Sequence, residues 1–591
     1  MHDFVSAKVV EARSKLSAIS LVAKQSPRAA HRLITSCVTK LLGFLAATVP
    51  PHISVPLLQT FDQDVENLFF EIIAPSGIEC SRNRLERARL KASLPSPFGC
   101  GLFKSSDQAK IAWWSSVACS LSDSLLFKMR DGLTRFAECA WQALVSLHGG
   151  SASKFWVQVQ HLYPDSSKGL LDGSRFSPTT PNTTKLTKIA LKIAAKQKIE
   201  RFQSQVSVSM LSDTLTESDI INASSRSFAG RIFSEPIKRP GFAFGNDAYI
   251  AFCRFFLGLP VANSIGGATQ QTGFDYPVQK CLASHGVHVS PYLDANANHA
   301  SAKCPAAARA VHQKHSNVMR VLVDAAKEAG LETRSEPDTY SLLLGEFSKI
   351  DCRRVFPSKT TVAYKAGFAA LSQAADFIAS ANCSFSVEEK SAYIQNKIDA
   401  LPILAAGDVK GLRIDVSIVN PSTGETKWVD VGAVHLSSPS YVAAELKAIA
   451  ARRLSTRVAE LHLLPDALQG DPSPTLLKRE IEKIEKYSRL VLVAKKQHAE
   501  NKRISIPKFT PFIVSDCGEL APLAYDLLEW IVEQFRLKCA KAGRRADGCL
   551  PADLVREFRH KLKVNLQLAV AAGLGAMIQA AGQPWRGLGE A

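Results

Sequence analysis

Apolar residues repeat at intervals of three and four along the first part of the chain. The segments 7–22, 27–47 and 61–73 all follow this spacing, which is typical of amphipathic helices. Proline and glycine interrupt the pattern at 49–51 and 94–101. We therefore expect a mainly helical N-terminal region.

A change of composition separates this region from the next part of the chain. Residues 149–185 are rich in Gly, Ser, Thr and Pro, which is typical of a linker or a long loop. The next segment predicts a basic helix with Lys185, Lys188 and Lys192 beside an apolar stripe. These lysines could contact nucleic-acid phosphates, or the helix could be an ordinary solvated amphipathic one. The pattern leaves both interpretations open.

Residues 411–436 show two β-branched runs on either side of the turn sequence Asn420–Gly424, a pattern that predicts a β-hairpin. Asp415 and Asp430 lie equally far from the centre of that turn, so a simple antiparallel pairing places them opposite each other at about 5 Å. A bulge in the turn would make them diagonal neighbours instead. The two carboxylates then either face water or share a divalent cation.

Helical and strand-like segments follow the hairpin. Residues 440–453 predict one helix, and a second, from about residue 476, carries Lys483 and Tyr487 four residues apart on one face. The apolar run 509–515 predicts a strand. Two helical stretches, 520–535 and 552–580, complete the pattern. The order predicts an α/β unit with a small mixed sheet.

Size and charge narrow the class of protein. A chain of 591 residues suggests three or four units, and its 72 basic and 54 acidic residues give a net charge of +18. Such charge favours an anionic partner, either nucleic acid or an acidic membrane surface, although it can also serve solubility alone.

The 13 cysteines are scattered singly. This spacing is typical of a reducing compartment. No signal-type start or uninterrupted membrane-length apolar run is present, so we expect a soluble intracellular protein.

One Cys/His group has the spacing of half a zinc knuckle. Four residues separate His299 from Cys304, and Cys281 lies upstream. Zinc prefers four N/S ligands in a tetrahedron, normally with a closely spaced first pair, and no second cysteine lies between Cys281 and Cys304. His285 or His288 would have to complete the set. We thus expect a degenerate zinc site.

The segments SPRAAHRLITSCVTKLLGFLAATVPP, FDQDVENLFFEII and SLPSPFGCGLFKSSDQAKIAWWSS resemble, in this order, the region that follows the polymerase palm in non-LTR retrotransposon reverse transcriptases. The resemblance implies a thumb-like region. That family also carries a Cys-Cys-His-Cys knuckle between polymerase and endonuclease, followed by a basic helix start similar to 309–315. No Asp-Asp dipeptide occurs in the chain, so the paired polymerase carboxylates are missing. We expect a C-terminal part of a longer element protein, or a decayed copy, without polymerase activity.

The C-terminal part resembles the restriction-like endonuclease of site-specific non-LTR retrotransposons, a branch of the PD-(D/E)xK nucleases. Arg413-Ile-Asp415 stands where that family has a basic residue, Pro and Asp, and Asp430 follows after fourteen residues. Lys483-Ile-Glu-Lys-Tyr487 matches its helical motif. The superfamily's usual lysine is replaced by Gly432, which leaves space for a lysine from a helix.

The resemblance implies a role for each of these residues. Asp415 and Asp430 would hold Mg²⁺, Lys483 would steady the attacking water or the scissile phosphate, and Tyr487 would hydrogen-bond to an adjacent phosphate. Glu445 and Lys447, two residues apart, are competing candidates for the third acid and the lysine. Arg413, like the lysines of the predicted basic helix, is an expected contact to nucleic acid.

The expected organisation combines these assignments. Residues 1–150 form the thumb-like helical region, 151–280 a linker with the basic helical region, 281–335 the degenerate knuckle with a helix, and 336–591 the endonuclease domain with C-terminal helices. The expected partners are DNA and retroelement RNA, with no membrane, and the expected place is the nucleus. The leading hypothesis is a nuclease that nicks target DNA. Its alternatives are an inactive nucleic-acid-binding remnant and an unrelated helical scaffold.

Overall fold

The structure is a computed structural model of the whole chain. It describes residues 1–122 apart from 39–40, 75–79, 81 and 96–97, then 245–261, 304–336 apart from 305–306, 414–454 apart from 437 and 439, 473–500, 506–542 and 551–581. It also describes the isolated residues 198, 199, 202, 232, 233, 377, 389 and 393.

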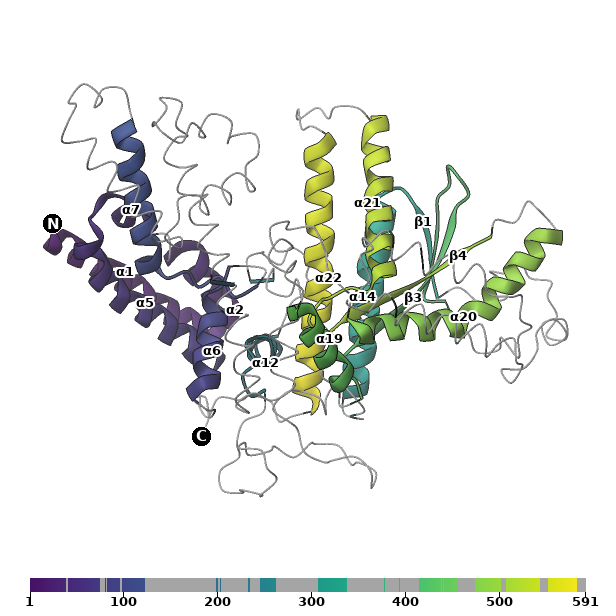
Figure 1. Cartoon of the computed structure of the whole chain (residues 1–591), viewed down its shortest axis with the longest axis horizontal. Helices are drawn as coiled ribbons and strands as arrows, with labels where there is room; N and C mark the ends of the chain where they lie inside the picture. Colours follow the sequence, from purple (N-terminus) through teal and green to yellow (C-terminus); the bar gives the residue numbers. More distant parts are fainter. Residues whose placement is uncertain are drawn as a thin grey trace, which may run out of the picture.

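Helices make up most of the described chain, and a small sheet lies in its C-terminal half (Figure 1). The helices of the N-terminal half are α1 (His2–Gln25), α2 (Pro27–Leu33), the π-helical turn η1 (Ile34–Val38), α4 (Gly43–Thr48), α5 (Pro51–Ile73), α6 (Arg82–Ser93), α7 (Ser105–Ser122) and α12 (Asn246–Leu257). The elements of the C-terminal half are α14 (Ala308–Glu328), β1 (Glu332–Ser335), β2 (Val416–Val419), β3 (Thr426–Val434), α19 (Val442–Leu454), α20 (Pro474–Glu500), β4 (Lys508–Ser515), α21 (Pro522–Ala542) and α22 (Pro551–Ala581).

The four strands form a mixed sheet in the order β1-β2-β3-β4. β2 pairs antiparallel with both β1 and β3, whereas β3 and β4 run parallel. A parallel pair needs a long crossover, and the segment containing α19 and α20 supplies it. The expected mainly helical chain with a small C-terminal mixed sheet is thus confirmed. The predicted boundary between the regions 281–335 and 336–591 falls directly after β1. It therefore separates β1 from β2, although the two strands pair.

Local turn chemistry sets the β2–β3 hairpin. The Asn420 side chain accepts a hydrogen bond from the Ser422 N–H at 2.9 Å, and the Gly424 N–H donates to the Asn420 carbonyl at 2.8 Å. Gly424 has φ of +73°, a backbone conformation that glycine adopts without strain. Val416 pairs with Val429, so the register follows the predicted turn centre and Gly424 does not shift it.

The two faces of the sheet carry different layers. Val429 and Phe512 face the large apolar core that also includes residues of α14, α21 and α22. Val434 and Ile513 face the other way, into a smaller cluster with residues of α19 and α20. Strand alternation places Asp430 on this second face, beside α20.

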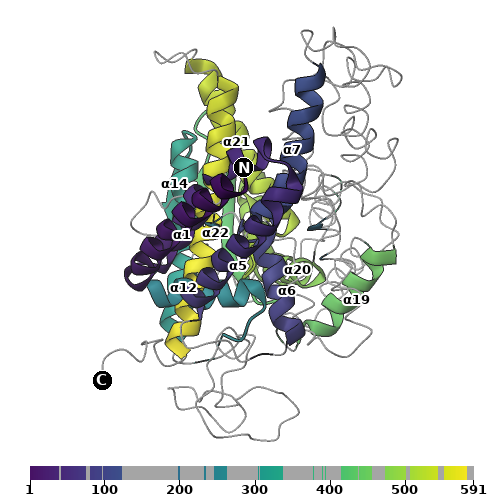
Figure 2. The same cartoon turned by 90° about the vertical axis from the view of Figure 1, so that its left-hand side faces the viewer.

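The N-terminal helices join the large core through α12. This helix packs against α2, α5 and α6 on one side and against α22 on the other. Figure 2 shows α1, α5, α6 and α7 in front of the long helices of the C-terminal half. One apolar cluster therefore includes residues from both halves of the described chain.

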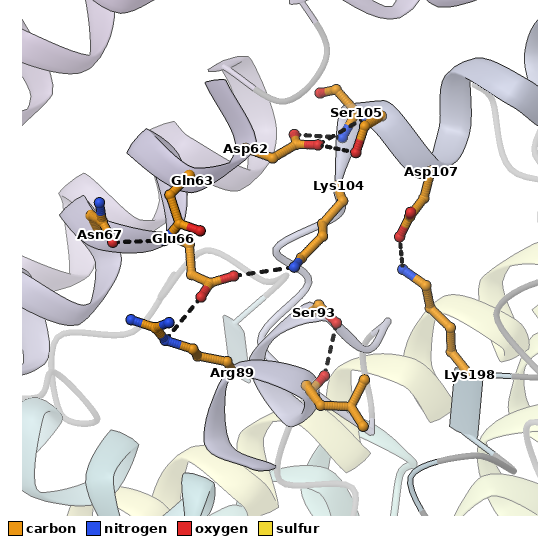
Figure 3. Close-up of polar contacts among 12 residues, drawn as sticks. Asp62, Gln63, Glu66, Asn67, Arg89, Ser93, Lys104, Ser105, Asp107 and Lys198 are labelled. Atoms are coloured by element: carbon orange, nitrogen blue, oxygen red, sulfur yellow. Dashed lines mark hydrogen bonds and ion pairs between the residues drawn. The ribbon is translucent and has the colours of Figure 1, made fainter. Parts of the chain in front are cut away.

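Buried polar contacts fix the start of α7 (Figure 3). The Asp62 carboxylate accepts hydrogen bonds from the Ser105 N–H at 2.7 Å and the Ser106 N–H at 2.9 Å. These amides belong to the first turn of the helix, which lacks partners within the helix itself. Glu66, on the same helix α5 as Asp62, binds Arg89 at 3.0 Å and Lys104 at 3.3 Å. The contacts tie α5, α6 and α7 together.

Helix α22 has the length and apolar composition of a membrane span over Pro551–Ala580, and no other helix in the described ranges does. Most of this stretch is buried inside the protein. α12, α14 and α21 pack against it. Its apolar character is thus accounted for by packing in the core.

His31 on α2 is a buried histidine with both ring nitrogens paired. Nε2 lies 3.1 Å from the Cys100 carbonyl oxygen, which can only accept, so Nε2 carries the proton. Nδ1 therefore accepts from the Tyr249 hydroxyl at 2.5 Å. Burial lowers the pKa of His31 to about 4. The folded protein holds this ring neutral.

Replacing His31 by glutamine is expected to make folding less sensitive to acid. The unfolded chain protonates this histidine near pH 6.5, and the folded chain does so only near pH 4. The contribution of His31 to the free energy of unfolding is therefore complete above pH 6.5 and is lost as the pH falls toward 4. Between about pH 7.5 and about pH 5 the wild type loses about 2 kcal/mol through this group. Urea unfolding of the wild type and the variant at the two pH values measures this loss of stability. Equal pH sensitivity in His31→Gln would contradict this assignment.

Candidate active site

Asp430 on β3 receives two groups from α20. The Tyr487 hydroxyl donates a hydrogen bond to Oδ1 at 2.5 Å, and the Lys483 ammonium forms an ion pair with Oδ2. Lys483 and Tyr487 are four residues apart, so one face of α20 presents both side chains to the sheet. Only 5% of the Asp430 side chain is exposed, whereas 27% of Lys483 is. The lysine therefore reaches the carboxylate from the solvent side.

Gly432 lies beside the side chains of Ile513 and Lys483. A Cβ atom at this position would lie 2.8 Å from Ile513 Cδ1 and 3.6 Å from Lys483 Cε. Ile513 pairs with Gly432 across the parallel strands, and its Cδ1 is the end of the side chain, so a larger residue at position 432 would require that side chain to shift. The distance to Lys483 Cε is an ordinary van der Waals contact, so a Cβ here would touch the lysine without excluding it, and the expectation that Gly432 makes room for the lysine stays a prediction.

Asp415 lies one residue before β2 and beside Asp430 in the hairpin. Its main-chain N–H donates to the Val429 carbonyl at 3.1 Å, and its side-chain Oδ2 accepts the Val431 N–H at 2.6 Å. Oδ2 also lies 2.9 Å from Nε2 of His315 on α14. Because a carboxylate only accepts, Nε2 is the protonated nitrogen. The structure thus brings Asp415, Asp430, Lys483 and Tyr487 together and adds His315.

The electrostatics of the cluster agree with its geometry. The hydrogen bond to Asp415 raises the pKa of His315, burial opposes this rise, and Asp430 adds to it while Lys483 subtracts. Burial raises the pKa of Tyr487 far above its usual value, and the Asp430 and Asp415 charges raise it further. Tyr487 therefore remains a hydroxyl donor at any physiological pH. His315 gains proton affinity from the carboxylates.

The oxygen ligands suit a hard cation such as Mg²⁺. Each carboxylate has one oxygen fixed by a hydrogen-bond donor: Oδ2 of Asp415 and Oδ1 of Asp430. The second oxygen of each carboxylate differs. Oδ2 of Asp430 pairs with the Lys483 ammonium, and Oδ1 of Asp415 has no partner among the described residues. The described residues contain no group of three His, Cys, Asp or Glu arranged for a metal. Mg²⁺ often binds through one or two carboxylates, with water and substrate phosphate completing its shell, so the pair fits it.

Glu445 has a different structural role. Its Oε1 accepts hydrogen bonds from the Ser473 hydroxyl at 2.5 Å and the Thr475 N–H at 3.1 Å, at the start of α20. An acidic side chain there satisfies helix amides and the positive end of the helix dipole. Glu445 thus positions the helix that carries Lys483 and Tyr487.

Replacing Glu445 by glutamine is expected to leave metal binding and any cleavage within about twofold of the wild type, while alanine lowers stability by about 1 kcal/mol. Glutamine keeps the acceptor oxygen, whereas alanine leaves the Thr475 N–H and the Ser473 hydroxyl without this acceptor, while Ser473 still caps the Leu476 N–H. Thermal unfolding and Mn²⁺ titration of both variants measure these effects. A loss of metal affinity in Glu445→Gln at unchanged stability would instead make Glu445 a ligand.

Other expected site residues lie outside the described residues: Arg413, Lys185, Lys188, Lys192, Cys281 and His299. Cys304 is described and is buried just before α14. The zinc site and these nucleic-acid contacts therefore stay predictions.

His315 is the member of the cluster that sequence reasoning missed. It belongs to the basic segment 309–315, which the pattern marked only as the start of a helix. It lies 100 residues before Asp415, its partner. No periodicity or spacing connects the two positions, so only the folded arrangement reveals the contact.

No family of known proteins matches the chain in a scan of its sequence, and a search of curated proteins finds no similar one.

Proposed function

We propose that the C-terminal half of the chain is a metal-dependent DNA endonuclease domain with a restriction-like, PD-(D/E)xK-type fold. One observation carries the proposal: Asp430 binds both Lys483 and Tyr487 from α20. Asp415 lies beside Asp430 in the hairpin. A lysine from a distant helix beside two strand carboxylates is the arrangement that the resemblance implies.

The chemistry is hydrolysis of a phosphodiester. A water oxygen attacks phosphorus and gives up a proton to solvent, the bond between phosphorus and the 3′ oxygen breaks, and the 3′ oxygen takes up a proton from solvent. Asp415 and Asp430 would hold Mg²⁺, which would supply Lewis acidity and neutralise the charge that develops on the phosphate. Lys483 is partly exposed, so its ammonium can also contact a phosphate oxygen or orient the water. Tyr487 holds Asp430 in place through its buried hydroxyl.

The order of segments supports a broader assignment. A helical region, a basic region, a Cys/His region, α14 and the hairpin with α20 succeed one another as in non-LTR retrotransposon proteins. We infer that the chain derives from such an element and acts in the nucleus on DNA with the element's RNA as a partner. Its net charge of +18 suits both nucleic acids. Polymerase chemistry is not part of this proposal.

A plasmid assay tests the nuclease. The purified chain is incubated with supercoiled plasmid in Mg²⁺ and, in parallel, in EDTA. The proposal predicts conversion to the open circular form only with Mg²⁺. An intact supercoiled plasmid in both reactions, at protein concentrations that bind the DNA, would contradict it.

A second candidate function is nucleic-acid binding without cleavage. The ion pair itself favours it, because Lys483 neutralises one of the two metal-binding carboxylates. DNA retention that weakens steeply with salt, without metal-dependent nicking, would be its signature.

A further inference from the structure

We propose that His315 is a positioning residue for the metal site: it fixes the Asp415 carboxylate so that Oδ1 remains available to a divalent cation. The inference rests on the proposed function for its biological meaning. It assigns to α14 a part in a site otherwise built from the hairpin and α20. Its ligand is a hard divalent cation.

The hydrogen bonds at Asp415 are the first argument. Oδ2 accepts from two donors, the Val431 N–H at 2.6 Å and His315 Nε2 at 2.9 Å. One donor comes from the neighbouring strand and the other from α14, so together they restrict rotation of the carboxylate. Oδ1 has no partner in the part of the chain that the structure describes. The arrangement turns one oxygen away from the protein's own donors.

The anchoring of α14 is the second argument. Lys314, the residue before His315, is buried and forms an ion pair with Asp516 at 2.5 Å. Asp516 also accepts from His435 Nδ1 at 2.9 Å. Burial opposes ionisation of Asp516, but Lys314 and His435 hold its pKa below the usual range. The ion pair therefore fixes α14 relative to the ends of β3 and β4.

Close packing restricts the same part of the helix. A Cβ atom at Gly573 of α22 would lie 2.4 Å from Lys314 Cβ, so the two helices touch at this point. A slide of α14 would break both the packing and the buried ion pair. His315 thus projects from a rigid support, as a residue that orients a metal ligand requires.

The position of His315 on the surface is the third argument. About a third of its side chain is exposed, so it adds little to the core. An ion pair at this exposure contributes little to folding stability. Donors that hydrogen-bond to metal ligands, by contrast, commonly change metal affinity by about 10-fold to 100-fold. The effect on metal binding should therefore exceed the effect on stability.

The test compares His315→Ala with His315→Gln in the full chain. Mn²⁺ serves as the probe, and its free concentration is followed by electron paramagnetic resonance. We expect alanine to weaken Mn²⁺ binding by about tenfold, and glutamine, whose amide can donate to the same oxygen, to recover most of the loss. Both variants should melt within a few degrees of the wild type.

Two controls make the result specific. His312→Ala removes an exposed histidine from the same helix and should leave Mn²⁺ affinity unchanged. Asp415→Asn sets the affinity expected when the ligand itself is lost. Unchanged affinity in His315→Ala, or equal losses in the alanine and glutamine variants, would overturn the inference.

The test of His315 and the test of the nuclease can fail independently. Mn²⁺ binding requires no cleavage, so a chain whose Mn²⁺ affinity depends on Asp415 and His315 but that never nicks a plasmid would contradict the nuclease alone. If the His315→Ala variant nicks plasmid as fast as the wild type at limiting Mg²⁺, that result would contradict the role of His315 alone.

Discussion

Replacing Asp430 by asparagine is expected to lower the rate of plasmid nicking by about a thousandfold. A carboxylate that holds a catalytic metal contributes several kcal/mol to the transition state, and each 1.4 kcal/mol changes the rate by about tenfold. Asparagine is nearly isosteric and keeps an oxygen for the Tyr487 hydroxyl, so the fold should persist. Nicking rates and Mn²⁺ titrations of the two proteins measure the loss.

The matched control is Asp553→Asn, which removes an exposed carboxylate near the start of α22. It changes the net charge equally and should leave nicking and Mn²⁺ affinity unchanged. A nicking rate in Asp430→Asn similar to that of the wild type would mean that the cutting site lies elsewhere.

Replacing Lys483 by methionine is expected to change binding and cleavage in opposite directions. The ammonium that neutralises Asp430 Oδ2 competes with a bound cation, so its removal should strengthen Mn²⁺ binding by about tenfold. In the proposed mechanism, the same change also removes the cation that would contact phosphate or water during hydrolysis. Nicking should therefore fall by about a hundredfold or more even when the metal is saturating.

Lys478→Met is the control for this variant. It removes an exposed lysine from the first turns of the same helix, with the same change in net charge. It should affect neither measurement. Weaker Mn²⁺ binding in Lys483→Met than in Lys478→Met would show that the lysine supports the metal, against the proposed competition.

Local chemistry explains which parts of the fold were predictable. The hairpin register follows from a turn whose Asn420 and Gly424 contacts involve only neighbouring residues. The strand Lys508–Ser515 is an apolar run, and the helix Pro474–Glu500 has a regular apolar stripe. Strand β1 gave no such signal, because Glu332–Ser335 is short, polar and mostly exposed. Its pairing with β2 depends on a partner far along the chain.

The site shows the same division between local and distant information. The position of Asp415 and Asp430 follows from the turn, and the shared face of Lys483 and Tyr487 follows from helical spacing. The contact of that face with Asp430 required a resemblance as well. His315 could not be found, because its contact depends on how α14 packs against the sheet. Glu445 carries a carboxyl group in the right region but meets the start of α20.

A crystal of the chain grown with Mn²⁺ tests the central claim most directly. Anomalous scattering locates the ion without reference to activity. The account predicts one strong peak in contact with carboxylate oxygens of both Asp415 and Asp430, with the Lys483 ammonium displaced from Asp430. Mn²⁺ bound only elsewhere, with the ion pair between Lys483 and Asp430 intact at saturating metal, would contradict it.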